Sequence, residues 1–331
     1  MNPAMSILGR DLAMDLGAAS TRIYLKRKGI VLDEPSAVMC DDRTGKVIRY
    51  GAEAAAPEAG GRTCWPVRDG LPADAELARR MIRHFLRKVH WHPYARPRVV
   101  MALPGDSTPI DRAALRDIAY ESDARTVHLV PHALAAGLGS GLTLTDRTGY
   151  MVIDIGTDAA RIAVLSGESV VATGSVPYGG RAVNRAIARY VEHEHGLQLD
   201  DAEAESAKRR AGGDDAEIVV TARDPDTGGE HELVLPVGRI FEAARQPVDS
   251  IARTAMETVE RCPAELAADL GERGAVLVGG GALLRGLGHR LREALCMPVR
   301  RAERPLEAVA LGLGRCVDEL GLIGRIRGGR P

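Results

Sequence analysis

The chain has 331 residues, of which 45% are hydrophobic and 27% charged, and its formal net charge at pH 7 is −1. This length predicts two domains, and the near-zero charge offers no general attraction to nucleic acid or to an anionic membrane, so we expect no nucleic-acid partner. The five cysteines are scattered, and no two have metal-ligand spacing, which predicts reduced thiols. The N-terminus shows no signal pattern and no apolar run reaches the ~20 residues that cross a bilayer, so the sequence predicts a cytoplasmic protein.

The apolar pattern predicts a series of strands and helices that occurs twice along the chain. In the first half, strands are expected at residues 12–16, 22–27, 29–32, 38–40, 47–50, 98–103 and 126–130, and helices at 74–89, 109–122 and 133–139. In the second half, a strand–turn–strand block is expected at 150–177, strands at 218–223, 231–236 and 275–278, and helices at 183–195, 200–210, 283–295 and 305–320. The stretch 237–262 is expected to be helical, with an interruption near Pro247. This order is typical of an α/β protein with two similar lobes.

A short motif occurs in both halves. The first copy contains Asp15 and Gly17, and the second contains Asp154 and Gly156; each lies between two apolar strands. Such a hairpin can hold phosphate, because its backbone N–H groups bind anionic oxygens and its aspartate binds the waters of a Mg²⁺ ion. Two copies that face one another predict a nucleotide held in a cleft between two domains.

Three consecutive glycines, Gly279, Gly280 and Gly281, follow an apolar strand and open the helix expected at 283–295. Glycine allows the backbone to approach a ligand closely, and a helix N-terminus offers unpaired N–H groups. The alternative is an ordinary turn between a strand and a helix.

Several segments resemble the bacterial actin homologues of the MreB/Mbl type, in the same order and over about residues 10–320. The resemblance is carried by residues 28–36, 96–100, 263–269 and 276–287, the last of which is similar to the adenosine-binding segment of that family. It implies the actin-like α/β fold of actin, hexokinase and the chaperone ATPases, with two similar lobes around a nucleotide cleft. Lobe I is expected at 1–140 with an inserted subdomain at about 30–68, lobe II at 141–304 with an inserted subdomain at about 183–240, and a C-terminal helix returns to lobe I at 305–331.

The resemblance also implies which residues bind ATP or ADP with Mg²⁺. The expected nucleotide-binding residues belong to the two hairpins, to the glycine segment or to the helix at 200–210; they are Asp15, Gly17, Ala18, Ala19, Ser20, Gly156, Thr157, Asp158, Glu205, Lys208, Gly279, Gly280, Gly281, Ala282 and Leu283. Asp15 and Asp154 would hold the metal through its waters. Glu205 and Lys208 lie on one side of their helix and match the family's residues around the ribose and adenine; the alternative is a solvated charge pair.

Both hairpins depart from the family pattern. The first has Ala18, Ala19 and Ser20 where the family has Thr, Ala and Asn, but its backbone donors are kept. The second has Thr157 and Asp158 in place of two glycines. A carboxylate ~4 Å from a phosphate repels it by ~4 kcal/mol at an effective dielectric constant near 20, unless Mg²⁺ takes the carboxylate as a ligand. These two substitutions therefore predict weakened ATP binding.

Two further positions depart from the family pattern. His132 stands where the family has the glutamate that positions the attacking water, so it would be the catalytic residue together with Asp154, or only a spacer. Arg181 replaces an acidic residue after two glycines. It would be either a phosphate contact or a surface charge.

Trp91 and Tyr94 lie in the loop where proteins of this family carry membrane-dipping apolar residues, so we expect them to contact the membrane or else to pack on their own lobe. The resemblance therefore implies a cytoskeletal protein that forms filaments at the inner face of the membrane and acts in cell shape or wall synthesis, with weak or no ATP hydrolysis. Its expected partners are further copies of itself, a conventional homologue, membrane morphogenesis proteins and the inner membrane surface. The alternatives are an active ATPase or kinase of the same superfamily, and a nucleotide-binding regulatory module that does not polymerise.

Overall fold

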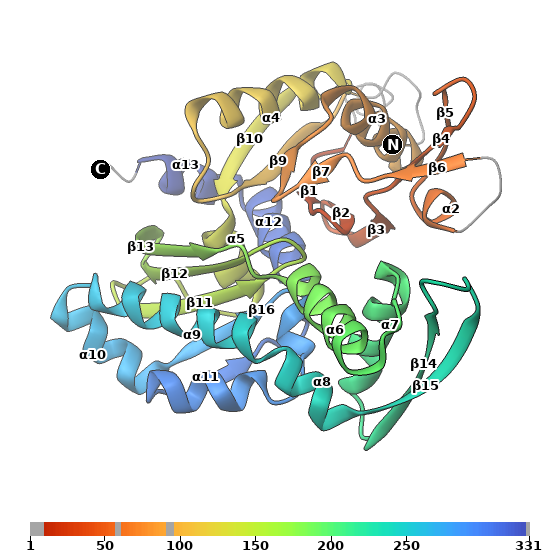
Figure 1. Ribbon diagram of the computed structural model, residues 1–331. Coiled ribbons are helices and arrows are strands. Elements are labelled where there is room, and N and C mark those ends of the chain that lie inside the picture. The colour runs from red at the N-terminus through yellow and green to blue at the C-terminus, as the bar shows by residue number, and fades with distance from the viewer. Residues whose placement is uncertain (1–9, 57–60, 91–95, 329–331) are drawn as a thin grey trace. The chain divides into compact units, whose positions relative to one another are not determined.

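The computed structural model describes residues 10–56, 61–90 and 96–328, and the chain divides into two compact units. Unit 1 comprises Met1–Thr148, Leu165–Val170 and Leu306–Pro331, whereas unit 2 comprises Gly149–Val164 and Val171–Pro305. Figure 1 shows the elements of each unit.

Unit 1 is built on a five-stranded sheet with the strand order β10-β9-β1-β2-β3. These strands are β1 (Leu12–Leu16), β2 (Ser20–Leu25), β3 (Gly29–Pro35), β9 (Arg98–Leu103) and β10 (Thr126–Pro131). The strands β1, β9 and β10 run parallel, and β2 and β3 are antiparallel additions. One face of the sheet shares a core with α3 (Ala75–Val89) and α4 (Pro109–Glu121), while α5 (His132–Gly139) and α12 (Ala308–Asp318) lie on the other face (Figure 1). The sheet is therefore covered on both faces, as a mostly parallel sheet requires.

The rest of unit 1 consists of short elements. They are a three-stranded sheet of β4 (Val38–Asp41), β5 (Val47–Tyr50) and β6 (Gly61–Cys64), the ribbon of β7 (Val67–Arg68) and β8 (Leu71–Pro72), and the helices α2 (Ala52–Ala55) and α13 (Leu320–Gly328).

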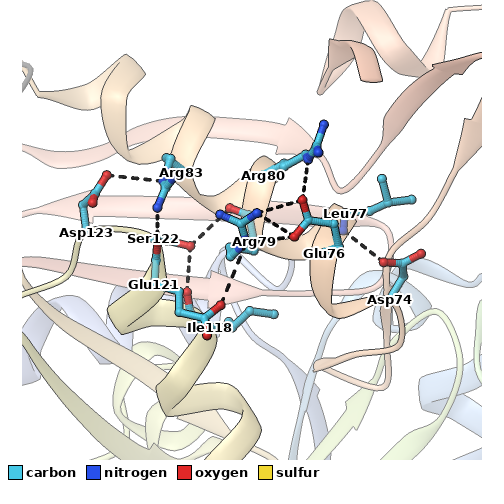
Figure 2. A network of polar contacts seen from close by, with 10 residues as sticks. All are labelled: Asp74, Glu76, Leu77, Arg79, Arg80, Arg83, Ile118, Glu121, Ser122 and Asp123. Atoms are coloured by element: carbon cyan, nitrogen blue, oxygen red, sulfur yellow. Dashed lines mark hydrogen bonds and ion pairs between the residues drawn. The ribbon is translucent and has the colours of Figure 1, made fainter. Parts of the chain in front are cut away.

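A polar network joins α3 to the end of α4 (Figure 2). The Arg83 Nε atom lies 3.3 Å from Asp123 Oδ2, and the Arg79 Nε atom lies 3.9 Å from Glu121 Oε2. The Ser122 hydroxyl donates to the Arg79 carbonyl at 3.2 Å. Exposed ion pairs stabilise a fold by less than about 1 kcal/mol each, so this network orients the two helices while the apolar core beneath them holds them together.

Unit 2 is built on a second five-stranded sheet, with the order β13-β12-β11-β16-β17. These strands are β11 (Gly149–Ile155), β12 (Ala160–Ser166), β13 (Ser169–Val176), β16 (Ala275–Val278) and β17 (Val299–Arg301). Their core is shared with α9 (Arg245–Glu260), α10 (Ala264–Arg273) and α11 (Leu287–Leu295). A separate apolar cluster joins α6 (Gly180–His195), α7 (Asp201–Ala211), the hairpin of β14 (Glu217–Arg223) and β15 (Glu230–Pro236), and α8 (Val237–Ala243).

The interruption expected near Pro247 is confirmed, because the stretch 237–262 forms two helices, α8 and α9, with the break at Ala244. Pro247 has no N–H group and lies in the first turn of α9, where none is needed. The structure corrects the bounds of two other helices. The helix expected at 305–320 spans only Ala308–Asp318, and a separate helix, α13, follows it at Leu320–Gly328. The helix expected at 283–295 begins four residues later, at Leu287, after Gly286 with a φ of 76°.

Candidate functional site

The first hairpin joins β1 to β2 by a tight turn in unit 1. The Gly17 N–H donates to the Ser20 carbonyl at 3.0 Å, and a Cβ atom at position 17 would lie 2.7 Å from that same oxygen. Only glycine therefore fits this turn. Asp15, at the end of β1, is buried, with 9% of its surface exposed.

A buried serine that the sequence analysis did not select supports this turn. The Thr21 and Ser36 hydroxyl oxygens lie 2.8 Å apart, and the Ser36 hydroxyl donates to the Gly17 carbonyl at 2.6 Å. The Ser36 N–H also donates to the Ala19 carbonyl at 3.0 Å. Ser36 thus holds both sides of the turn, although no local sequence pattern indicates a contact between positions 19 residues apart.

The second hairpin joins β11 to β12 in unit 2 and repeats this geometry. The Gly156 N–H donates to the Ala159 carbonyl at 3.0 Å, and Asp154 at the end of β11 is 8% exposed. Each hairpin therefore has a buried aspartate at the end of its first strand and a glycine N–H that closes the turn. This shared geometry matches the repeat that the sequence indicates.

Asp158, at the tip of the second hairpin, forms an ion pair with Arg181. The Asp158 Oδ1 atom lies 2.6 Å from Arg181 Nη1, and the aspartate side chain is only 9% exposed. The sequence left open whether Asp158 opposes a phosphate or binds Mg²⁺, and whether Arg181 is a phosphate contact or a surface charge. In the structure the two side chains neutralise each other.

The glycine segment packs against the base of the second hairpin. A Cβ atom at Gly279 would lie 2.3 Å from Asp154 Oδ1, and one at Gly281 would lie 2.1 Å from the Ile155 side chain. Gly280–Leu283 form a 3₁₀ turn, in which Ala282 is buried and Leu283 is exposed. The glycines therefore open a 3₁₀ turn and not the expected α-helix, which begins only at Leu287.

Glu205 and Lys208 lie one turn apart on α7 and form an ion pair of 2.5 Å. Asn184 Nδ2 donates to the Glu205 carboxylate at 2.9 Å, and Lys208 Nζ donates to the Gly180 carbonyl at 3.4 Å. Burial alone would raise the pKa of Glu205, but the hydrogen bonds from Lys208 and Asn184 outweigh it and the pKa is lowered. Burial also lowers the pKa of Lys208, although Glu205 acts against this. Glu205 and Lys208 thus belong to a partly buried network of hydrogen bonds.

A chain of contacts brings several of the expected residues of unit 2 together. The Gly180 N–H donates to the Gly156 carbonyl at 2.9 Å, so the second hairpin, the start of α6 and Lys208 are connected. Gly279 borders Asp154 on the other side. Unit 2 therefore gathers Asp154, Gly156, Lys208 and Gly279 around one hairpin.

Of three other expected residues, one belongs to unit 1 and two are not described. His132 is the first residue of α5, part-buried, in the unit that contains the first hairpin. Trp91 and Tyr94 lie outside the described residues. Within the described ranges, no cluster of three or more His, Cys, Asp or Glu side chains could hold a metal ion. Of the helices that the structure describes, none is long and apolar enough to cross a membrane.

Comparisons with known proteins identify relatives over nearly the whole chain. The model of the MreB/Mbl protein family matches residues 9–325. The cell shape-determining protein MreB of Escherichia coli K12 is 38% identical over 335 residues, covering 96% of each chain. The cell shape-determining protein Mbl of Bacillus subtilis 168 is 34% identical over 326 residues, covering 95% of this chain and 97% of Mbl.

Solved structures show the same fold. MreB5 of Spiroplasma citri bound to AMPPNP has a TM-score of 0.89 and 26% identity, covering 97% of this chain and 99% of MreB5. MamK from a double helical filament has a TM-score of 0.79 and 20% identity, covering 93% and 99% of the two chains, and this likeness concerns the fold alone. The fold is therefore the actin-like α/β fold expected from the sequence.

Proposed function

The chain belongs to the MreB/Mbl family, and from this premise we propose that it is a cytoskeletal protein that binds an adenine nucleotide and forms filaments. MreB and Mbl, at 38% and 34% identity, are named cell shape-determining proteins. The observation that carries the nucleotide proposal is the pair of equivalent hairpins, each with a buried aspartate and a glycine-closed turn. MreB5 of Spiroplasma citri, which shares the fold, was solved with AMPPNP and with ADP.

The proposed nucleotide contacts divide between the two units. The first hairpin would offer the backbone of Gly17 to Ser20 to phosphate, and the second hairpin would offer its tip around Gly156. Asp15 and Asp154 would bind the waters of Mg²⁺, while Glu205 and Lys208 would contact the ribose and adenine. The glycine segment at 279–281 and its neighbours Ala282 and Leu283 would border the adenosine.

We propose that hydrolysis is weak or absent. In place of the family's glycines after Gly156, the chain has Thr157 and the paired Asp158, and α5 starts with His132 in place of a carboxylate. Both changes remove groups that position and stabilise a phosphoanhydride under attack by water.

The proposed setting is the inner face of the cell membrane, in filaments that act in cell-wall morphogenesis with a conventional homologue and membrane morphogenesis proteins. Membrane contact would be made by Trp91 and Tyr94, whose amphipathic rings suit the interface. We also propose that each of the two lobes carries a smaller inserted subdomain. Changing both aromatic residues to serine should lower co-sedimentation with anionic liposomes, and unchanged pelleting would contradict this contact.

The experiment that tests the central proposal combines sedimentation, electron microscopy and phosphate release on the full chain with Mg²⁺ and ATP. We expect filaments that pellet with ATP or ADP and little phosphate release. Rapid phosphate release without a pellet would favour an active ATPase or kinase, and binding without either would favour a regulatory module.

A matched pair of variants tests the first hairpin. Asp15→Asn should weaken Mg²⁺-dependent ATP binding, because it removes the charge that holds the metal waters. Asp33→Asn, on β3 of the same sheet, should leave binding unchanged because its side chain is exposed and pairs with Arg22. Equal binding by the two variants would contradict the role of Asp15.

A further inference from the structure

The ion pair of Asp158 and Arg181 lies at the tip of the second hairpin. The Asp158 carboxylate is almost fully buried, at 9% exposure, whereas 36% of the Arg181 side chain is exposed. Burying an unpaired carboxylate is costly, so the ion pair with Arg181 helps to stabilise Asp158 at this tip. Arg181, in the first turn of α6, is the more exposed partner, so it is the charge of this pair that faces solvent.

Backbone contacts hold the hairpin against the first turn of α6. The Gly180 N–H donates to the Gly156 carbonyl and the Arg181 N–H donates to the Thr157 carbonyl, both at 2.9 Å. A Cβ atom at Gly179 would lie 2.6 Å from both of these carbonyl oxygens, so the close approach requires glycine. These two N–H groups at the start of α6 are therefore used within the protein and are not available to an anion.

The Arg181 side chain carries further donors at the start of α6. A guanidinium group carries five N–H donors in a planar fork, and one of its terminal nitrogens, Nη1, is bound to Asp158. Among the residues that the structure describes, Arg181 forms an ion pair with Asp158 alone. The remaining donors can bind a second anion, as a bidentate arginine does with phosphate.

We propose that Arg181 is a phosphate-binding residue of the second hairpin and that Asp158 holds it in position. The proposal rests on the proposed function, and it names the group that replaces the missing glycines as the phosphate ligand. Since the arginine is a permanent positive charge, it also predicts that nucleotide binding depends less on Mg²⁺ than a site built from backbone donors alone.

Calorimetric titration of the full chain with ADP and with adenosine tests this role. Arg181→Ala should weaken ADP binding about 10- to 100-fold, the usual effect of losing a charge-assisted hydrogen bond, and should leave adenosine binding unchanged. Arg181→Lys should lose part of the affinity, because lysine keeps the charge but not the fork. The control is Arg185→Ala, one turn further along α6 and exposed, which makes the same change in net charge and should bind ADP as the wild type does.

The double variant Asp158→Ala with Arg181→Ala separates two explanations. If Arg181 acts only by neutralising Asp158, the double variant should recover wild-type affinity for ADP, and that result would overturn the proposal. We expect the double variant to stay at least about 10-fold weaker, because the phosphate contact is lost. Melting temperatures without nucleotide identify any variant that fails to fold, and in that case the lysine variant supplies the test.

Two other results would count against the proposal. Equal ADP affinity of Arg181→Ala and Arg185→Ala would overturn the role of Arg181 while leaving the proposed nucleotide binding intact. A wild-type chain that binds neither ADP nor ATP, with or without Mg²⁺, would overturn the proposed function itself. Conversely, ADP binding by the wild type that persists in EDTA and is lost on Arg181→Ala would support the proposal.

Discussion

Gly139 of α5 and Gly312 of α12 meet where the backbones of the two helices touch. A Cβ atom at Gly139 would lie 1.6 Å from the Ala308 carbonyl oxygen, and one at Gly312 would lie 1.8 Å from the Ala135 carbonyl oxygen. Backbone atoms cannot move aside as a flexible side chain can. Gly139→Ala or Gly312→Ala should therefore lower the free energy of unfolding by about 3 kcal/mol, the upper part of the usual range for overpacking, as measured by urea denaturation.

The control for this crossing is Gly324→Ala in α13. Beyond the backbone of its own helix and its chain neighbours, no atom of the described residues lies within 4 Å of a Cβ atom at Gly324, so the alanine meets open space. This variant should raise the free energy of unfolding by up to about 1 kcal/mol, through helix propensity alone. A loss of stability at Gly324 as large as that at Gly139 would contradict the packing explanation.

Ser36 should be important for the stability of the first hairpin. Ser36→Ala removes the hydroxyl that donates to the Gly17 carbonyl and leaves buried polar groups without that partner. We expect a loss of about 1–3 kcal/mol in the free energy of unfolding. Ser169→Ala, at an exposed position of β13, should change it by less than about 0.5 kcal/mol, and equal losses would contradict the role of the buried hydroxyl.

Long, regular elements were predicted well from the sequence. The strand at 12–16 and the helix at 74–89 are confirmed, because both have strong apolar periodicity and α3 has Asp74 as an N-cap. The short strand Gly61–Cys64 was missed, because four residues are too few to show an alternation. The helix Ala264–Arg273 was also missed as an element; it is short and buries only Leu270 fully.

The candidate site could be predicted only where it is local in sequence. The Asp-x-Gly pattern identifies both hairpin turns, because the glycine and its hydrogen-bond partner are three residues apart. The contacts of Ser36 with Gly17 and of Arg181 with Asp158 join separate elements, so they depend on the tertiary fold. The packing of Gly279 on Asp154 likewise follows from the parallel pairing of β11 with β16.

The Glu205 carboxylate should make stability depend on pH. Burial alone would raise the pKa of Glu205, but the hydrogen bonds to its charged form outweigh burial and hold the pKa below the ordinary value of a glutamate. A group of this kind stabilises the fold above its unfolded pKa, and the contribution is lost as the pH falls through its folded pKa. Glu205→Gln should cost about 1–3 kcal/mol at neutral pH, and the difference from wild type should shrink as the pH falls below about 4.5.

The matched control for Glu205 is Glu217→Gln on the exposed side of β14. Its unfolding curve should follow that of wild type at every pH. The free energy of unfolding of the wild type can be compared with that of Glu205→Gln at each pH. A difference that stays constant from neutral to acidic pH would show that the carboxylate charge has no part in the network.

His132 should limit phosphate release if the chain binds ATP as proposed. His132→Glu places a carboxylate at the first residue of α5, where the helix dipole favours a negative charge, so the fold should tolerate it. A carboxylate that orients the attacking water should raise the rate of phosphate release by about 10-fold or more. His132→Gln is the matched control, because it has a side chain of similar size without a charge. Equal rates for the two variants in a phosphate-release assay would show that Thr157 and the Asp158–Arg181 pair, and not His132, limit hydrolysis.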